Sequence, residues 1–351
     1  MKIVIVAGGI GQRLWPLSHT RSPKQMQPFF GSQTLLQRTV SRLRRKFKPS
    51  DIYIVTGKEY YAAAAAQLPA AFRKRFLVEP ARRGTTAAIG FAAYTLARHD
   101  SHEIIVSIAA DHFIGDEDRF VRSLALMERV VRRDPKAVCL MGIKPTAPET
   151  GLGYIETGGS VRFLTGTTVL RVLRFVEKPD LATAKKFIRS KRFWWNPSYF
   201  AWRVDRVKEL FEEHIPETHR LLARTVDGHP RAFAEIHTPA IDYTIMEKLH
   251  EHFYLIPGNF LWADVGHWAS VHEIQAAGGD GNVTLGLEHA IDTKRSLIYN
   301  YTDRVLAVAG VENLIIVQTE NGTLVCGKDR AQDVRRLVEA MQRDKKFKKF
   351  I

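Results

Sequence analysis

Short apolar runs alternate with amphipathic stretches along the first 150 residues of the chain. Apolar runs of the length of buried strands occupy residues 3–7, 52–55, 103–110 and 137–143. Apolar positions recur at helical spacing within residues 34–46, 85–98 and 118–133. This alternation predicts an α/β fold in which helices flank a mostly parallel sheet.

The pattern changes twice after residue 150. Residues 151–265 contain broken strands and helices, and we expect them to lie over the carboxyl edge of the sheet. The sequence GGDGN at 278–282 is typical of a linker, and closely spaced strand-like runs and a final amphipathic helix follow it. We therefore predict a main domain over residues 1–277 and a small β-rich domain over residues 278–351.

Composition narrows the class of protein. The chain has 351 residues, of which 45% are hydrophobic, enough for a sizeable core. No apolar run reaches the ~18 residues that a membrane helix needs, and the first residues lack a cleavable-signal pattern. Cys139 and Cys326 lie in apolar runs without metal or disulfide spacing. These features predict a cytoplasmic protein with no membrane partner.

The net charge of +15 arises partly from two basic runs, at residues 42–48 and 343–349. We interpret these runs as a solvated helix face and a charged tail. A nucleic-acid-binding protein is an alternative, but we expect no nucleic-acid partner because no recognised module accompanies the charge. A basic balance also suits a pocket for anionic metabolites.

The first apolar run leads into a glycine-rich loop that two cations follow. The loop residues are Ala7, Gly8, Gly9 and Gly11. Backbone amides beside glycines can approach an anion closely, while Arg13 and Lys24 add a guanidinium fork and a point charge. The loop matches neither the Walker A pattern nor the full dinucleotide fingerprint. Alone, it fits a tight structural turn as well as a phosphate site.

The loop and its extension carry a family resemblance. The string AGGIGQRLWPLS and the PKQ at 23–25 resemble the signature of sugar-1-phosphate nucleotidyltransferases, in particular the mannose-1-phosphate guanylyltransferase branch. The resemblance covers essentially the whole chain. It implies a Rossmann-like fold of the nucleotide-diphospho-sugar transferase type, with the catalytic domain over residues 1–277. It also implies a homodimer formed through the small domain.

The resemblance implies transfer of GMP from GTP to mannose 1-phosphate, giving GDP-mannose and pyrophosphate. Arg13 and Lys24 would be catalytic and hold the triphosphate, and Ala7, Gly8, Gly9 and Gly11 would bind the nucleotide. The segment at 78–93 resembles the family's base and ribose segment. Its nucleotide-binding candidates are Glu79, Gly84 and Thr85. The carboxylate of Glu79 can accept from guanine N1–H and the N2 amino group, whereas Gly84 replaces the family's Asn.

Two aspartates are candidates for a metal site. Asp111 follows an apolar strand, so its carboxylate should emerge at the carboxyl edge of the sheet, where open α/β sheets bind ligands. Asp264 lies in WADVGHW at 262–268. The family uses these two aspartates to hold Mg²⁺, with phosphate oxygens and water completing the octahedron. Asp111 thereby also contributes to nucleotide binding. His267 stands where the family usually has Ser, and its role is open.

The resemblance also implies a sugar-phosphate site. Its candidates are Gly153, Tyr154, Glu177, Lys178 and Asn196. A carboxylate suits sugar hydroxyls and an ammonium suits the 1-phosphate. Ser198 replaces a family Gly, and Asp242 either orients the pocket or caps a helix.

Other functions stay open at this point. Because of Gly84 and Ser198, another nucleotide or hexose phosphate is an alternative within the same fold. A non-catalytic regulatory subunit that binds a nucleotide sugar is an alternative of another class. Since the sequence stops before the isomerase domain that longer family members append, we expect a one-reaction enzyme.

Overall fold

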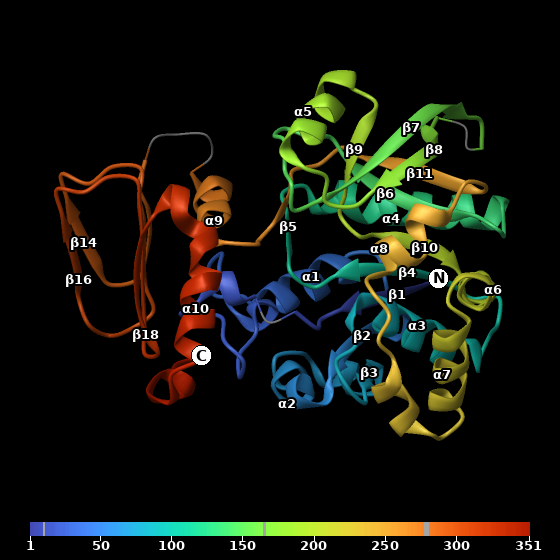
Figure 1. The fold of residues 1–351 in the computed structure, drawn as a ribbon, viewed down its shortest axis with the longest axis horizontal. Helices are drawn as coiled ribbons and strands as arrows, with labels where there is room; N and C mark the ends of the chain where they lie inside the picture. The colour runs from blue at the N-terminus through green and yellow to red at the C-terminus, as the bar shows by residue number, and fades with distance from the viewer. Residues whose placement is uncertain (10, 164–165, 277–280) are drawn as a thin grey trace. The chain divides into compact units, whose positions relative to one another are not determined.

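The computed structural model describes residues 1–9, 11–163, 166–276 and 281–351, which form two compact units (Figure 1). Unit 1 comprises Met1–Gly8, Thr39–Ala110 and Ile114–Trp262, and unit 2 comprises Gly9–Arg38, Asp111–Phe113 and Ala263–Ile351. Residues 277–280, at the predicted domain boundary, lie outside the described residues, so that boundary stays a prediction.

A ten-stranded sheet forms the centre of unit 1. In spatial order its strands are β11 (Phe253–Gly258), β8 (Val169–Val176), β7 (Gly153–Val161), β9 (Phe193–Asn196), β6 (Val138–Ile143), β10 (Phe200–Arg203), β4 (Ile104–Ala109), β1 (Lys2–Val6), β2 (Ile52–Gly57) and β3 (Phe76–Glu79). The neighbouring strands β3, β2, β1 and β4 are parallel. Strand β11 pairs not only with β8 but also with β6, and its pairing with β6 is parallel. The predicted α/β fold is therefore confirmed.

The segment after residue 150 takes a different place from the predicted one. Strands β7 to β11 hydrogen-bond into the same sheet instead of lying over its edge. Strand β10 pairs antiparallel with both β4 and β6, and β7 pairs antiparallel with β8 and β9. The prediction of a covering elaboration was wrong because these short strands continue the sheet.

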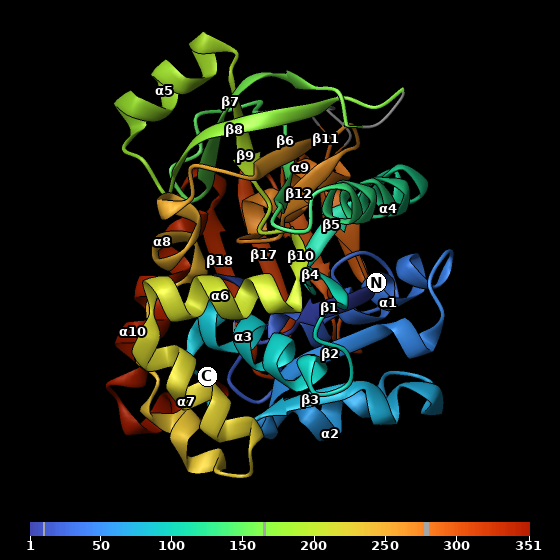
Figure 2. The ribbon, with the colours of Figure 1, turned by 90° about the vertical axis from the view of Figure 1, so that its right-hand side faces the viewer.

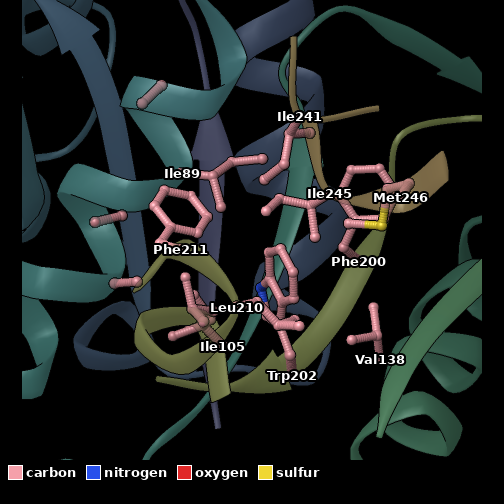
Figure 3. Packing of buried hydrophobic residues seen from close by; sticks show 14 of the residues in the cluster. Ile89, Ile105, Val138, Phe200, Trp202, Leu210, Phe211, Ile241, Ile245 and Met246 are labelled. Carbon is pink, nitrogen blue, oxygen red and sulfur yellow. The ribbon is translucent and has the colours of Figure 1, made fainter. Parts of the chain in front are cut away.

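Helices cover both faces of this sheet. Side chains alternate along a strand, so Val4 points to one face while Ile3 and Ile5 point to the other. Val4 belongs to a core cluster built with α3 (Gly84–Ala97), α6 (Val204–His214) and α7 (Pro216–Val226), three helices that pack together (Figure 2). Within it, Ile105 and Trp202 of the sheet meet Ile89 and Phe211 of the helices (Figure 3).

The remaining helices of unit 1 are arranged around the strands. Helix α4 (Glu117–Arg133) packs on β6, β10 and β11, α2 (Lys58–Ala66) on β2 and β3, and α5 (Leu181–Ser190) on β9. Helix α8 (Ile241–Thr244) is a single turn beside α3, whereas α1 (Leu35–Arg44) begins in unit 2 and ends in unit 1. No helix of the described residues is long and apolar enough to span a bilayer.

Unit 2 contains parallel strands joined without intervening helices. Its strands are β13 (Val283–Leu285), β14 (Glu288–Ile291), β15 (Leu297–Asn300), β16 (Leu306–Ala309), β17 (Leu314–Thr319) and β18 (Gly322–Gly327). Four of these strands form one sheet in the order β13-β15-β17-β18, and β14 and β16 form a second sheet. Since all pairs except β17–β18 are parallel, the chain winds in coils between two sheets. The predicted small β-rich domain is confirmed.

The core of unit 2 also includes the N-terminal loop segment. Residues Leu14, Trp15 and Phe29 pack with Trp268 and with Tyr299 of β15 in one buried cluster. This cluster includes side chains from α9 (Trp268–Gln275) and α10 (Val334–Gln342). Two short strands, β5 (His112–Ile114) and β12 (Trp262–Asp264), pair with each other. The loop that carries the candidate phosphate ligands therefore folds with the C-terminal segment.

Candidate active site

Buried Lys24 and two partly exposed aspartates form a charge cluster in unit 2. The Lys24 Nζ lies 2.8 Å from Asp111 Oδ2 and 3.2 Å from Asp264 Oδ1. It also donates to the main-chain carbonyl of Val265 at 3.2 Å. The Lys24 residue is 8% exposed, so its ammonium exchanges water for these three oxygens. The fold thus brings together three of the predicted site residues from distant parts of the chain.

The charges of this cluster shift its pKa values. Burial alone lowers the pKa of Lys24, but the carboxylates of Asp111 and Asp264 outweigh burial and raise it above the ordinary value. Burial raises the pKa of Asp264, but Lys24, His112 and Arg13 outweigh it and hold that pKa at about 2. Near neutral pH the cluster therefore contains the Lys24 ammonium and an ionised Asp264 carboxylate.

Gly11 lies against the side chain of Lys24. Its φ is +78°, in the left-handed region that favours glycine, and it precedes a short 3₁₀ helix, η1 (Gln12–Leu14). A Cβ at this position would lie 2.7 Å from the Cβ of Lys24. Any larger residue would therefore displace the Lys24 side chain, so glycine is required by packing here.

Arg13 lies on η1 beside the charge cluster. A Cβ at Gly266 would lie 3.2 Å from Asp264 Oδ2 and 3.7 Å from Arg13 Nη1, so the two side chains flank one point of the backbone. Arg13 makes no ion pair or hydrogen bond with the residues that the structure describes. Its guanidinium keeps its donors available for an anion.

The two carboxylates fit a divalent cation. Both approach one ammonium within 3.2 Å, so they converge on a single point, and both offer the oxygen donors that Mg²⁺ prefers. Among the described residues there is no cluster of three or more His, Cys, Asp or Glu side chains suited to a metal ion. Asp111 and Asp264 could therefore hold a cation only with further oxygens from phosphate or water.

His267 has a structural role in unit 2. Its Nδ1 accepts from the amide of Ser270 at 3.2 Å, and its own amide donates to the Ser270 hydroxyl at 3.4 Å. This capping box begins α9, directly after the segment that carries Asp264. Serine is itself a favoured N-cap residue, so the family's Ser and this His can serve the same cap.

The start of the glycine loop lies at the end of β1 in unit 1. The Ala7 carbonyl accepts from the Thr56 hydroxyl at 3.2 Å, and the Gly8 carbonyl accepts from Arg82 at 3.1 Å. A Cβ at Gly8 would meet nothing within 4 Å, and the same holds at Gly9 in unit 2. Packing within the protein does not explain these two glycines, whereas close approach by a ligand would.

Glu79 is a buried carboxyl at the end of β3. It is 4% exposed and has no hydrogen bond to the residues that the structure describes. Burial, with a smaller contribution from Glu59, raises the pKa of Glu79 to about 7, while Arg82 opposes the shift. A carboxyl in this state is suited to a partner with hydrogen-bond donors.

Gly84 and Thr85 begin α3. Gly84 has a φ of +83°, and a Cβ there would meet nothing within 4 Å. Asn is the residue that best tolerates this conformation after Gly, so the exchange of the family's Asn for Gly preserves the backbone. The Thr85 hydroxyl accepts from the amide of Ile241 at 3.3 Å, which ties the helix start to α8.

Three of the predicted sugar-phosphate ligands are adjacent in unit 1. Gly153 pairs with Asn196 across β7 and β9, and a Cβ on Gly153 would collide with the Glu177 carboxylate. The other Glu177 oxygen pairs with Lys178, whereas Oε2 is buried without a hydrogen-bond partner in the described structure. Tyr154 is fully buried, with its ring beside that of Phe187. The group therefore leaves one carboxylate oxygen unsatisfied.

Asn196 is held at both ends of its amide. Its Nδ2 donates to Asp242 Oδ1 at 2.8 Å, and its Oδ1 accepts from the amide of Ser198 at 2.9 Å. Ser198 has a φ of +56°, so it adopts the conformation for which glycine is usual. Burial and Glu177 raise the pKa of Asp242 to about 6, although Lys178 opposes them. Asp242 orients Asn196; its side chain does not cap α8.

Sequence reasoning missed two contributors. The Val265 carbonyl, which accepts from Lys24, has no side-chain signal. Glu247 accepts from the amide of Glu177 at 3.0 Å. Its position in AIDYTIMEK, beside Asp242, was the available signal.

Comparison with known proteins identifies the family of the chain. Residues 2–280 match the family described as nucleotidyl transferase, and residues 288–341 match the MannoseP isomerase/GMP-like beta-helix domain. The chain is 34% identical to the xanthan biosynthesis protein XanB of Xanthomonas campestris pv. campestris, covering 97% of this chain and 73% of that protein.

Two further relatives agree with this result. A mannose-1-phosphate guanylyltransferase of Escherichia coli is 32% identical, covering 97% of this chain and 73% of its own. A solved structure described as mannose-1-phosphate geranyltransferase from Thermus thermophilus matches with a TM-score of 0.87 and 33% identity, covering 97% of this chain and 99% of that one. The chain therefore belongs to the nucleotidyltransferase family, and it carries the family's β-helix domain.

Proposed function

We propose that the protein transfers GMP from GTP to mannose 1-phosphate, forming GDP-mannose and pyrophosphate. The observation that carries this proposal is the cluster of Lys24, Asp111 and Asp264, supported by Arg13 on the adjoining helix. The similarity to a mannose-1-phosphate guanylyltransferase and to the xanthan biosynthesis protein XanB supports this proposal.

The proposed reaction is a single in-line displacement. An oxygen of the sugar 1-phosphate attacks the α-phosphorus of GTP, forming a new P–O bond while the bond to the bridging oxygen of the β-phosphate breaks. Pyrophosphate leaves with that electron pair, and no covalent enzyme intermediate forms. The attacking oxygen is already anionic, so the reaction needs positioning and charge neutralisation more than a general base.

Different residues of the chain bind the triphosphate and the base. Arg13 and Lys24 hold the triphosphate and stabilise the charge that develops on pyrophosphate. The amides at Gly8 and Gly9 approach the phosphates, because a Cβ at either position would meet nothing within 4 Å. Gly11 contributes by leaving space for the Lys24 side chain. Glu79 accepts from the guanine edge.

The acceptor sugar has its own ligands. Lys178 pairs with the 1-phosphate, and the free Glu177 oxygen and Asn196 receive sugar hydroxyls. Gly153 allows the close packing around the Glu177 carboxylate, while Tyr154 fills the core beneath it. In the proposed nucleotide site, Gly84 and Thr85 fix the start of α3.

Enzymes of this family generally use a divalent metal ion. We propose Mg²⁺, held by Asp111 and Asp264. When bound, it would neutralise phosphate charge. Lys24 keeps the Asp264 carboxylate ionised and orients both carboxylates toward one point.

A homodimer is also proposed, formed through the β-rich segment. Leu287 precedes β14, Ile291 ends it and Val305 precedes β16. These residues are 54%, 55% and 64% exposed, respectively. Large exposed apolar side chains grouped on one segment are typical of an interaction surface. We also propose that the protein is cytoplasmic.

A substrate panel tests the proposed reaction. GTP, ATP, UTP and dTTP are each offered with mannose 1-phosphate or glucose 1-phosphate, with and without Mg²⁺, and pyrophosphate release is measured. We expect release with GTP and mannose 1-phosphate in the presence of Mg²⁺. Activity only with another nucleotide or sugar would support another family specificity, and no release in any combination would favour the regulatory subunit.

A further inference from the structure

The Trp15 side chain lies where the signature loop of unit 2 meets the C-terminal segment. Trp15 follows η1, which carries Arg13, and it is 7% exposed. Its indole Nε1 donates to the carbonyl of Phe350 at 2.9 Å. The loop is therefore hydrogen-bonded to a residue 335 positions later in the chain.

A second hydrogen bond ties the same residue to the segment of Asp264. The buried indole of Trp268 donates to the Trp15 carbonyl at 2.9 Å. Trp268 begins α9, four residues after Asp264. The backbone that presents Arg13 is thus fixed to the backbone that presents Asp264.

A third contact comes from the turn between β17 and β18. A Cβ built on Gly322 would lie 3.1 Å from both Cη2 and Cζ2 of Trp15. The Gly322 backbone therefore borders the edge of the indole ring, and its φ of +156° is also unusual for other residues. Strands β17 and β18 belong to the coiled β-rich segment.

We propose that Trp15 is a positioning residue through which the C-terminal β-rich segment holds Arg13 in place for phosphate binding. Two hydrogen bonds and the Gly322 contact fix both the main chain and the ring of Trp15. Leu14, between Arg13 and Trp15, is fully buried in the same cluster. Arg13 itself has no hydrogen bond or ion pair among the described residues, so its position depends on the backbone that carries it.

The first test compares two glycine variants. Gly322→Ala adds a methyl group against the Trp15 ring. Gly310→Ala is the matched control, because Gly310 also has a positive φ, +65°, lies in the same β-rich segment and has open space around its Cβ. Hydrogen exchange of the peptide spanning residues 11–20 is measured by mass spectrometry, together with the melting temperature.

We expect exchange in this peptide to rise about 10-fold in Gly322→Ala and to stay at the wild-type level in Gly310→Ala. Equal exchange in the two variants at 11–20 would overturn the proposal, whatever their melting temperatures. This measurement requires no enzymatic activity, so its result is independent of whether the proposed guanylyl transfer is correct.

The second test is kinetic and rests on the proposed function. We expect Trp15→Phe, which removes the indole N–H, to lower kcat about 10-fold while the KM for mannose 1-phosphate is unchanged. In an Arg13→Ala background, Trp15→Phe should lower kcat little further, because both changes remove the contribution of Arg13 to kcat. Additive losses would show that Trp15 does not act through Arg13. Absence of wild-type turnover would contradict the proposed function instead, and the exchange test would still decide this inference.

Discussion

The Lys24 ammonium is buried between two carboxylates, and this arrangement serves both the fold and the proposed chemistry. Its pKa is raised although burial alone would lower it, so the lysine stays charged. Removing it would leave Asp111 and Asp264 facing each other without a cation. The same three groups could therefore exchange partners when phosphates and a metal ion bind.

Replacing members of this cluster should reduce catalysis strongly. We expect Lys24→Ala and Asp264→Ala each to lower kcat at least ~100-fold, a loss comparable with that of one oxyanion-hole donor. Lys2→Ala is the control, since Lys2 pairs with Asp51 at 2.7 Å in another part of the chain. Steady-state kinetics on folded protein check this, and near-wild-type turnover in both cluster variants would contradict the assigned roles.

Glu79 gives a pH-dependent prediction. Its pKa is raised to about 7 chiefly by burial, so the protonated form dominates below this pH and the carboxylate above it. Only the carboxylate can accept two hydrogen bonds from guanine. GTP should therefore bind more tightly as the pH rises from about 6 to about 8, through the pKa of about 7.

Titration calorimetry with GTP at several pH values measures this effect. Glu79→Gln carries no titrating group at this position, and it corrects for ionisation of GTP itself. We expect the affinity difference between wild type and Glu79→Gln to grow with pH. If the GTP affinities of the two proteins changed with pH in parallel, Glu79 would be ruled out as the ligand of guanine.

At the scale of elements, α9 depends on its N-cap residue, His267. His267 accepts from the Ser270 amide through Nδ1, so His267→Ala should lower the free energy of unfolding by about 1 kcal/mol. His267→Ser should keep the stability near that of the wild type, because Ser is also an effective cap. Urea unfolding of the three proteins measures this. Equal losses in the Ala and Ser variants would show that the histidine ring contributes through something other than the cap.

Elements with strong local patterns could be predicted from the sequence. The apolar runs at 3–7 and 137–143 became β1 and β6, and the helical spacing at 118–133 became α4. Strands β7 to β10 could not be placed, because their antiparallel pairing depends on distant partners. The winding of the β-rich segment was also missed, since β13 and β14 are short and each carries one exposed polar residue, Thr284 and His289.

Site residues were predictable to a similar degree. Motifs singled out Lys24, Asp111 and Asp264, which the fold brings together. The contacts that hold them came from main-chain groups such as the Val265 carbonyl, which leave no trace in residue type. The exchanges at Gly84 and Ser198 needed backbone angles to be understood, because both residues occupy the left-handed region.

At the scale of the whole molecule, the proposed homodimer can be tested on the β-rich segment. Ile291 ends β14 and is 55% exposed. Ile291→Lys places a charge there, and we expect the dissociation constant of the dimer to rise at least ~10-fold, because burying an unpaired charge is unfavourable. Light scattering across a concentration series measures the mass. Lys345→Ala, which alters charge outside β13 to β18, serves as the control.

The wild-type protein should be dimeric at micromolar concentrations. A wild type that is monomeric at every concentration would contradict the proposed assembly. An Ile291→Lys variant that remains as dimeric as the wild type would place the interface elsewhere.

In the proposed reaction, GMP moves intact from GTP to mannose 1-phosphate. GTP labelled with ³²P at the α-phosphate is incubated with the protein, Mg²⁺ and mannose 1-phosphate, and the products are separated. We expect the label to appear in GDP-mannose while pyrophosphate is released without it, and Lys24→Ala to slow both at least ~100-fold. Label that remains in GTP, or that appears only in free GMP, would contradict the proposed transfer.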